Sequence, residues 1–135
     1  GKIGVDESIL NKPGRLTDDE YEKIKLHPVI GANIIKEIGF LKTSAKIVLS
    51  HHEHYDGTGY PNGKKGNEIP LEASILCVAD VYDALTSDRP YRKAMSNEQA
   101  INIIKKDIGT MFDPRVAQVF IDMIESKEEA EKIAG

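Results

Sequence analysis

The chain has 135 residues, of which 40% are hydrophobic and 30% charged, values typical of one globular domain with its own core. Its formal net charge of −4 argues against binding to DNA, because contact with phosphate backbones needs an excess of Lys and Arg. No run approaches the roughly 20 apolar residues needed to cross a bilayer. The single cysteine, Cys77, lies in an apolar run, and we expect it to pack as a small hydrophobe in a reducing cytoplasm.

The first half of the chain carries the start and stop signals of three helices. The run Thr17–Glu20 matches a capping box with acidic residues in the first turn, and it predicts a helix over residues 17–27. Pro28 suits the first position of a second helix, which Gly39 ends. Apolar residues predict a third helix over 43–53. A loop follows to about residue 70, and its turn-forming Gly, Asn, Asp and Pro residues indicate an ordered loop rather than a linker.

Three further helices are predicted in the second half. Apolar residues at positions 71, 75, 78, 82 and 85 make one helical face toward a core. The run Ser96–Gln99 is a second capping box, and Asp113-Pro114 begins the last helix. We expect that helix to fray from Lys127, where the sequence becomes strongly charged. No alternating apolar and polar run is long enough for a convincing strand, so we predict an all-α fold of about six helices.

Three of the four histidines stand within residues 51–54, beside a glycine-rich turn. If the helix ending at His51 and His52 packs against the helix that carries Asp80, two imidazoles and a carboxylate converge, with His27 available from a helix junction. Such a nitrogen and oxygen set suits iron, manganese or zinc, and two ions would allow hydrolysis of a phosphoryl group. Asp80 lies in an apolar helix, so we expect it to be buried with a partner. The alternative is a polar helix end running into a solvated loop.

A local basic group follows the helix that carries Asp80. It consists of Arg89, Arg92 and Lys93, and it can hold a phosphate despite the negative net charge of the chain. The alternative is a solvated loop with ordinary surface ion pairs.

Several of these motifs together closely resemble the HD-GYP domain family. They are His51-His52-Glu53, Asp56-Gly57, Gly59-Tyr60-Pro61, Val78-Ala79-Asp80, Asp83-Ala84-Leu85-Thr86 and Asp88-Arg89-Pro90-Tyr91-Arg92. The resemblance extends from Gly1-Lys2 to about residue 126 and leaves residues 127–135 as a charged tail.

The resemblance implies a helical bundle of the HD phosphohydrolase type with an ordered GYP loop, which hydrolyses cyclic di-GMP to pGpG or GMP with two or three ions, usually iron or manganese. The positions that match metal ligands are His27, His51, His52 and Asp80. Lys2 matches a catalytic lysine that contacts the scissile phosphate or a metal-bound group, and Asp80 is also assigned a catalytic role. The positions that match substrate-binding ones are Gly59, Tyr60, Pro61, Asp83, Arg89 and Arg92. Tyr60 either stacks on guanine or packs in its turn with the hydroxyl in water.

One departure concerns the pair that gives the family its name. In the family a His-Asp pair stands directly before a Gly-Lys like Gly1-Lys2, and this chain begins at that glycine. We therefore expect a fragment, with residues 1–126 as an HD-GYP domain lacking its N-terminal part. Because the missing aspartate helps to bridge the metals in the family, we expect the fragment to be weak or inactive alone.

Three hypotheses remain open. The first is a cytoplasmic cyclic di-GMP phosphodiesterase domain, with a sensor or receiver module as a partner in a longer protein. The second is a non-catalytic module that binds a nucleotide or a protein in cyclic di-GMP signalling. The third is a metallophosphohydrolase for another nucleotide, against which the GYP loop and Arg89 argue. Apolar surface left uncovered in a fragment also leads us to expect a homodimer.

Overall fold

A computed structural model describes residue 2, residues 4–89 and residues 92–134 of the chain. This part is all-helical, with no strand, as predicted. In chain order its elements are α1 (Glu7–Leu10), α2 (Asp18–Ile24), α3 (His27–Lys36), the 3₁₀ turn η1 (Gly39–Leu41), α4 (Lys42–Ser50), the 3₁₀ turn η2 (Gly66–Glu68), α5 (Leu71–Thr86), α6 (Asn97–Lys106) and α7 (Pro114–Ala134). The six predicted helices are present, and the single turn α1 is an addition. None of the described helices is long and apolar enough to span a membrane.

The helices begin where their capping residues predicted. The side-chain oxygen of Thr17 accepts a hydrogen bond from the Glu20 amide at 3.3 Å, and the Glu20 carboxylate accepts one from the Thr17 amide at 2.7 Å. Ser96 and Gln99 repeat this reciprocal pair at the start of α6. Such pairs satisfy amides that the first turn of a helix leaves without partners.

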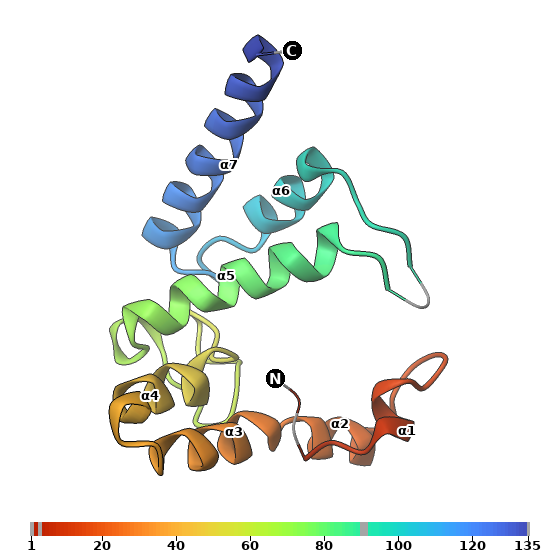
Figure 1. Cartoon of the computed structure of the whole chain (residues 1–135), viewed down its shortest axis with the longest axis vertical. Coiled ribbons are helices and arrows are strands. Elements are labelled where there is room, and N and C mark those ends of the chain that lie inside the picture. The colour runs from red at the N-terminus through yellow and green to blue at the C-terminus, as the bar shows by residue number, and fades with distance from the viewer. Residues whose placement is uncertain (1, 3, 90–91, 135) are drawn as a thin grey trace.

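Several helix ends differ from the expectations. Helix α2 ends at Ile24 rather than at residue 27, and α3 ends at Lys36, before Gly39. The third predicted helix does not reach residue 53, because α4 ends at Ser50 and leaves His51 as its C-cap. The helix expected to fray from Lys127 instead continues through α7 to Ala134, where Figure 1 shows it projecting beyond the body of the molecule.

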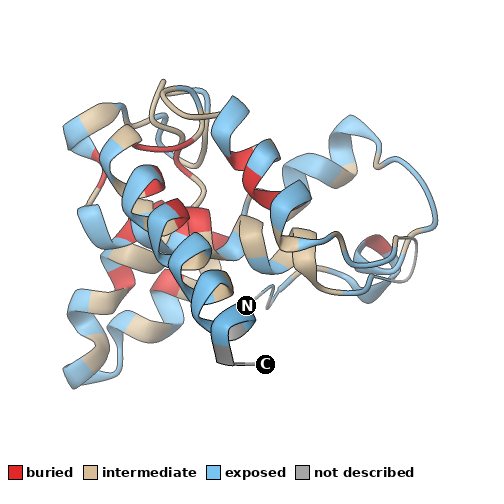
Figure 2. Ribbon diagram, turned by 90° about the horizontal axis from the view of Figure 1, so that it is seen from above, coloured by how far each residue is buried: buried red, intermediate tan, exposed pale blue. Residues whose placement is uncertain are grey.

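Helix α5 crosses the middle of the molecule and separates two groups of elements (Figure 1). One side of α5 packs against α6 and α7 around a core that Figure 2 shows as a concentration of buried residues. The core residues are Cys77, Val78, Ile101, Ile104, Phe112, Ala117 and Ile121. Cys77 is only 4% exposed, which confirms that it packs as a small hydrophobe.

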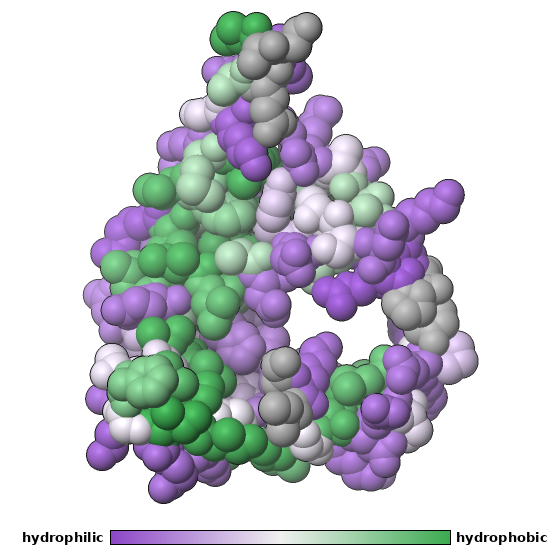
Figure 3. Space-filling view, in the orientation of Figure 1, coloured by the Kyte–Doolittle hydropathy of each residue, from purple (hydrophilic) through white to green (hydrophobic). Residues whose placement is uncertain are grey.

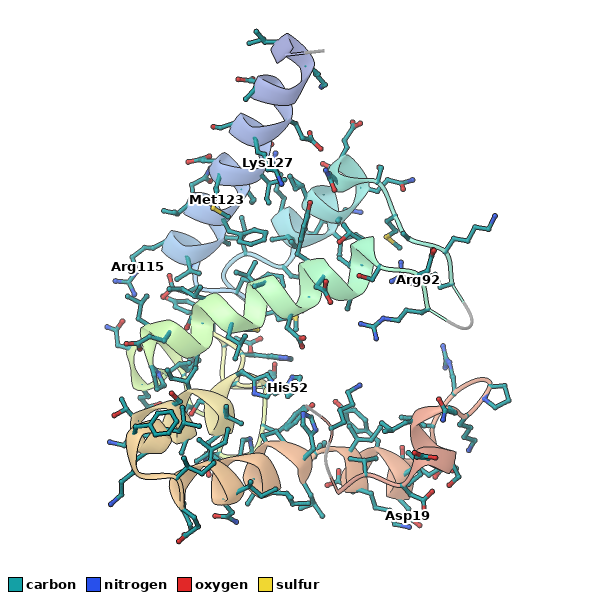
Figure 4. All side chains as sticks on the ribbon, in the orientation of Figure 1. Asp19, His52, Arg92, Arg115, Met123 and Lys127 are labelled. Atoms are coloured by element: carbon teal, nitrogen blue, oxygen red, sulfur yellow. The ribbon has the colours of Figure 1, made fainter. Side chains whose placement is uncertain are left out.

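The N-terminal elements lie on the other side of α5. There α3 and α4 pack side by side, joined by η1. The short connection makes these helices antiparallel neighbours, so the start of α3 meets the end of α4. That end of the pair lies near α5, where Figure 4 labels His52.

Candidate metal centre

Three imidazoles converge where α3 begins and α4 ends. His27 is the first residue of α3 and is buried, whereas His51 caps α4 and His52 follows it in the next turn. The ring centroid of His27 lies 5.8 Å from that of His51 and 4.9 Å from that of His52. Within the described residues, these three form the one group of potential metal ligands whose donor atoms all lie within 4.8 Å of one another. The predicted convergence of the three histidines is therefore present.

Hydrogen bonds orient two of these rings. Nδ1 of His27 lies 2.6 Å from the carbonyl oxygen of Ile24, and Nδ1 of His51 lies 2.6 Å from that of Val48. A carbonyl only accepts, so each Nδ1 carries the proton and each Nε2 keeps a free lone pair. A backbone carbonyl in this role is typical of metal-ligating histidines, because it fixes both the tautomer and the direction of the ring.

The spacing of the nitrogens fits a divalent ion. Nε2 of His52 lies 3.1 Å from Nε2 of His27. Two nitrogens bound to one ion at about 2.0–2.1 Å lie about 3.0 Å apart at a right angle and about 3.4 Å apart at the tetrahedral angle. Burial is the main cause that lowers the pKa of His27, and it lowers the pKa of His52 to about 3. Both rings are therefore neutral at pH 7, as metal ligands must be.

A cavity of about 810 Å³ extends from the imidazoles to α5. Its lining brings together the predicted catalytic and metal-binding residues, namely Lys2, His27, His51, His52 and Asp80, and one predicted substrate-binding residue, Arg89. Apolar residues of α1, α4 and α5 complete the wall. The N-terminal segment and the segment that follows α5 both contribute to the lining, and Figure 3 shows an opening between them. The cavity therefore gathers cationic groups and imidazoles around one space, an arrangement suited to a phosphorylated ligand.

Asp80 differs from the expectation. It lines the cavity from α5, but its side chain is exposed rather than buried, and its carboxylate is not part of the 4.8 Å group of ligands. The expectation of burial failed because α5 carries apolar residues on several sides. Leu76, one turn before Asp80, is itself 38% exposed.

The GYP loop packs on the metal site instead of lining the cavity. Gly59 lies so close to the main chain of residues 52–54 that an added Cβ would stand 2.3 Å from the amide nitrogen of His54. The Tyr60 ring stacks on the His52 imidazole, with centroids 4.9 Å apart and planes at 20°. Of the two interpretations of Tyr60, this contact supports packing within the turn. Pro61 follows in the same loop and is not among the described cavity residues either.

Two further predicted substrate contacts point elsewhere. The guanidinium of Arg92 donates to the carbonyl oxygens of Ala84 at 2.5 Å and Leu85 at 3.1 Å, so it caps the end of α5 (Figure 4). Asp83 is exposed and accepts a hydrogen bond from the Ser87 hydroxyl at 3.3 Å. Neither residue is among the described lining of the cavity.

Sequence reasoning gave no role to Glu53, which is 2% exposed. Its carboxylate accepts hydrogen bonds from the main-chain amides of Asn62 at 2.8 Å and Lys64 at 2.9 Å. The available signal was an acidic residue directly after two histidines and before a loop rich in glycine, where unpaired amides need an acceptor.

Comparison with known proteins places the chain in a family. A family model described as HD domain matches residues 1–116. The chain is 43% identical to the cyclic di-GMP phosphodiesterase response regulator RpfG of Xanthomonas campestris pv. campestris, covering 100% of this chain and 35% of that protein. It is 44% identical to a cyclic di-GMP phosphodiesterase of Vibrio cholerae, covering 90% of this chain and 26% of that protein.

A third relative and a solved structure come from the same bacterium. The chain is 41% identical to the 3'3'-cGAMP-specific phosphodiesterase 3 of Vibrio cholerae, over 84% of this chain and 25% of that protein. The crystal structure of the cyclic GMP-AMP specific phosphodiesterase V-cGAP3 matches with a TM-score of 0.68 at 23% identity, over 90% of this chain and 32% of that one. The chain thus spans about a third or less of the length of these relatives. With the family match, the GYP loop and the shared fold together, the chain belongs to the HD domain family, in its HD-GYP group.

Proposed function

We propose that this chain is the core of a metal-dependent phosphodiesterase that hydrolyses cyclic di-GMP to pGpG or GMP. One observation carries the proposal: three imidazoles converge in a cavity whose lining also includes a carboxylate, a lysine and an arginine. Two curated relatives named as cyclic di-GMP phosphodiesterases support the choice of substrate.

The residues that line the cavity have two proposed roles, metal binding and phosphate binding. Nε2 atoms of His27, His51 and His52, together with the carboxylate of Asp80, would hold two or three divalent ions, iron or manganese by family resemblance. Such ions, when bound, polarise phosphoryl oxygens and lower the pKa of water. Lys2 and Arg89 bind and orient the phosphates, Arg89 with the paired donors that suit a phosphate. None of these roles requires the GYP loop to touch the substrate.

A second substrate has its own support. Relatives named as 3'3'-cGAMP-specific phosphodiesterases match this chain at 41% and 35% identity, so cyclic GMP-AMP belongs in the same assay. Both substrates contain two phosphodiester bonds in a ring and differ in one base.

The remaining expectations concern the setting of the enzyme. We propose that it acts in the cytoplasm, with a sensor or receiver domain as regulatory partner and as a homodimer. That residues 127–135 lie outside the domain also stays a prediction. Sedimentation over a concentration series tests the dimer, and a strict monomer would contradict it.

Turnover tests the function. Each dinucleotide is incubated with Mn²⁺ or anaerobic Fe²⁺, and the products are separated by chromatography. The enzymes are this chain and a form extended upstream by the matching segment of the Xanthomonas relative. We expect linear product from the extended form, and a loss of at least about 100-fold in His51→Ala, which removes an oriented ligand.

His54→Ala is the matched control, because His54 stands in the same run but its Nδ1 contacts the Thr58 hydroxyl at 3.1 Å outside the ligand group. Full activity of His51→Ala would refute the metal site. Nucleotide binding by the extended form without product, unchanged by a chelator, would favour the non-catalytic module.

A further inference from the structure

The three imidazoles of the metal site are not held in the same way. His27 and His51 each have a backbone carbonyl that fixes Nδ1. For His52 the described part of the chain shows no such acceptor at Nδ1, and the one hydrogen bond of its ring joins Nε2 to Nε2 of His27. A histidine ligand without a hydrogen bond to its other ring nitrogen has no fixed ring orientation. Another contact must therefore orient the His52 ring.

Tyr60 provides this contact. Its ring lies nearly parallel to the His52 imidazole, and its amide donates to the carbonyl oxygen of His52 at 3.0 Å. The Tyr21 ring also packs against the Tyr60 ring in a T-shaped arrangement, with ring centroids 6.4 Å apart and planes at 81°. Stacked aromatic rings at this separation restrict each other's rotation about χ2. The same residue therefore fixes both the backbone and the ring of His52.

Glu53 holds the loop that carries Tyr60. Each oxygen of its buried carboxylate accepts one main-chain amide, from Asn62 and from Lys64. Hydrogen bonds to an ionised acceptor are about twice as strong as neutral ones. Glu53 is adjacent to His52 in sequence, and its hydrogen bonds hold the two ends of the loop segment 53–64 together. Within this segment, Gly59 packs closely against the main chain of residues 52–54 and further fixes the loop.

We propose that Glu53 and Tyr60 are positioning residues for the metal ligand His52: Glu53 fastens the loop, and the loop presses the Tyr60 ring onto the imidazole so that Nε2 faces Nε2 of His27. The inference rests on the proposed metal site. It departs from the substrate-binding role predicted for the loop, and the absence of residues 59–61 from the described cavity lining supports that departure.

Zinc binding and the NMR signals of the ring test the proposal. The affinity for Zn²⁺ alone is measured by calorimetric competition with a chelator. We expect Tyr60→Phe, which keeps the flat ring, to change the Kd by less than about twofold, and Tyr60→Leu, which keeps the bulk but not the ring, to raise it about 10–100-fold. Glu53→Gln should raise it about tenfold, because an amide NH₂ cannot accept from a main-chain amide.

Glu68→Gln is the matched control for the lost charge. Glu68 is exposed in the same loop and accepts from the Lys65 amide at 2.9 Å, so its change should leave the Kd unaltered. Circular dichroism verifies the fold of each variant. If Glu53→Gln does not fold, the comparison of Tyr60→Phe with Tyr60→Leu decides alone.

The metal-free chain gives a second, independent result. His27 accepts at Nε2, so the proton of neutral His52 must sit on Nε2, and ¹⁵N shifts of the ring should show that single tautomer in the wild type and in Tyr60→Phe. In Tyr60→Leu the shifts should move toward the average of two tautomers. Unchanged zinc affinity and ring shifts in Tyr60→Leu would overturn the proposal. If the wild type binds no zinc, the proposed metal site fails, while the metal-free ring shifts still decide whether Tyr60 positions His52.

Discussion

Replacing Gly59 by alanine should destabilise the protein strongly, because there is no room for a methyl group. The added Cβ would lie 2.3 Å from the His54 amide nitrogen, 2.4 Å from the His52 carbonyl oxygen and 2.6 Å from Cα of Glu53. All three atoms are main-chain atoms, so no rotamer change relieves the contact. The two segments must separate by about 1 Å to reach ordinary van der Waals distance, and overpacking of this kind costs about 1–3 kcal/mol.

The separation also breaks the hydrogen bond from the Tyr60 amide to the His52 carbonyl, which contributes about 1 kcal/mol. We therefore expect Gly59→Ala to lower the free energy of unfolding by about 2–4 kcal/mol. For a domain of this size each kcal/mol lowers Tm by about 3 °C, so the melting temperature should fall by about 6–12 °C.

Gly39→Ala provides the matched control. An added Cβ at Gly39 meets no atom within 4 Å, and its φ lies outside the left-handed range. Its Tm should stay within about 2 °C of the wild type, since removing a glycine there costs nothing in the fold and restricts the unfolded chain. Thermal melts followed by circular dichroism compare the three proteins. If Gly59→Ala melts within 2 °C of Gly39→Ala, the close packing of the GYP loop on residues 52–54 is wrong.

Three other outcomes follow from the structure. Burial lowers the pKa of His27 and His52 below 6.5, so between about pH 6.5 and 4 the unfolded chain takes up protons that the folded chain does not. Guanidinium titrations should therefore show that the free energy of unfolding falls as the pH drops from about 6.5 toward 4. A free energy of unfolding that does not change with pH would contradict this. Burial raises the pKa of Cys77 to about 12, so iodoacetamide should label it only on unfolding, and rapid labelling of the native chain would show an open core. Arg92→Ala frees two carbonyls at the end of α5 and should lower the free energy of unfolding by about 1–3 kcal/mol, with Arg92→Lys recovering only part; an unchanged urea midpoint would remove the capping role.

Much of the fold was predictable because its signals are local. The capping boxes at Thr17 and Ser96 involve residues three apart, and the structure confirms both. The end of α4 was missed because no glycine or proline stands at Ser50, and the chain turns there to let Glu53 and the loop close. The continuation of α7 past Lys127 was missed because charge alone does not end a helix whose residues otherwise favour it.

The site was predictable in composition but not in arrangement. A cluster of histidines is easily recognised in the sequence, and His27, His51 and His52 do converge. The exposure of Asp80 depends on how α5 is rotated against its neighbours, and the capping role of Arg92 depends on how the chain turns back after α5; no local pattern encodes either. Tyr60 had two open interpretations, because the sequence alone does not tell a tyrosine that stacks on guanine from one that packs in its own turn, and its stacking on the His52 imidazole was not predicted.

The division of the cavity between two groups of helices has a mechanical consequence. The imidazoles belong to the α3 and α4 pair, whereas Asp80 and Arg89 belong to α5 and the segment after it, so the width of the cavity depends on how the α3 and α4 pair packs against α5. A ligand that contacts both walls adds a link between these two groups of helices. Its binding free energy then adds to the cohesion of the whole molecule, by RT ln(1 + [L]/Kd), rather than to that of one half. Saturation of the cavity should therefore be visible from far away, as slower amide exchange in α6 and α7 as well as in α3 and α4.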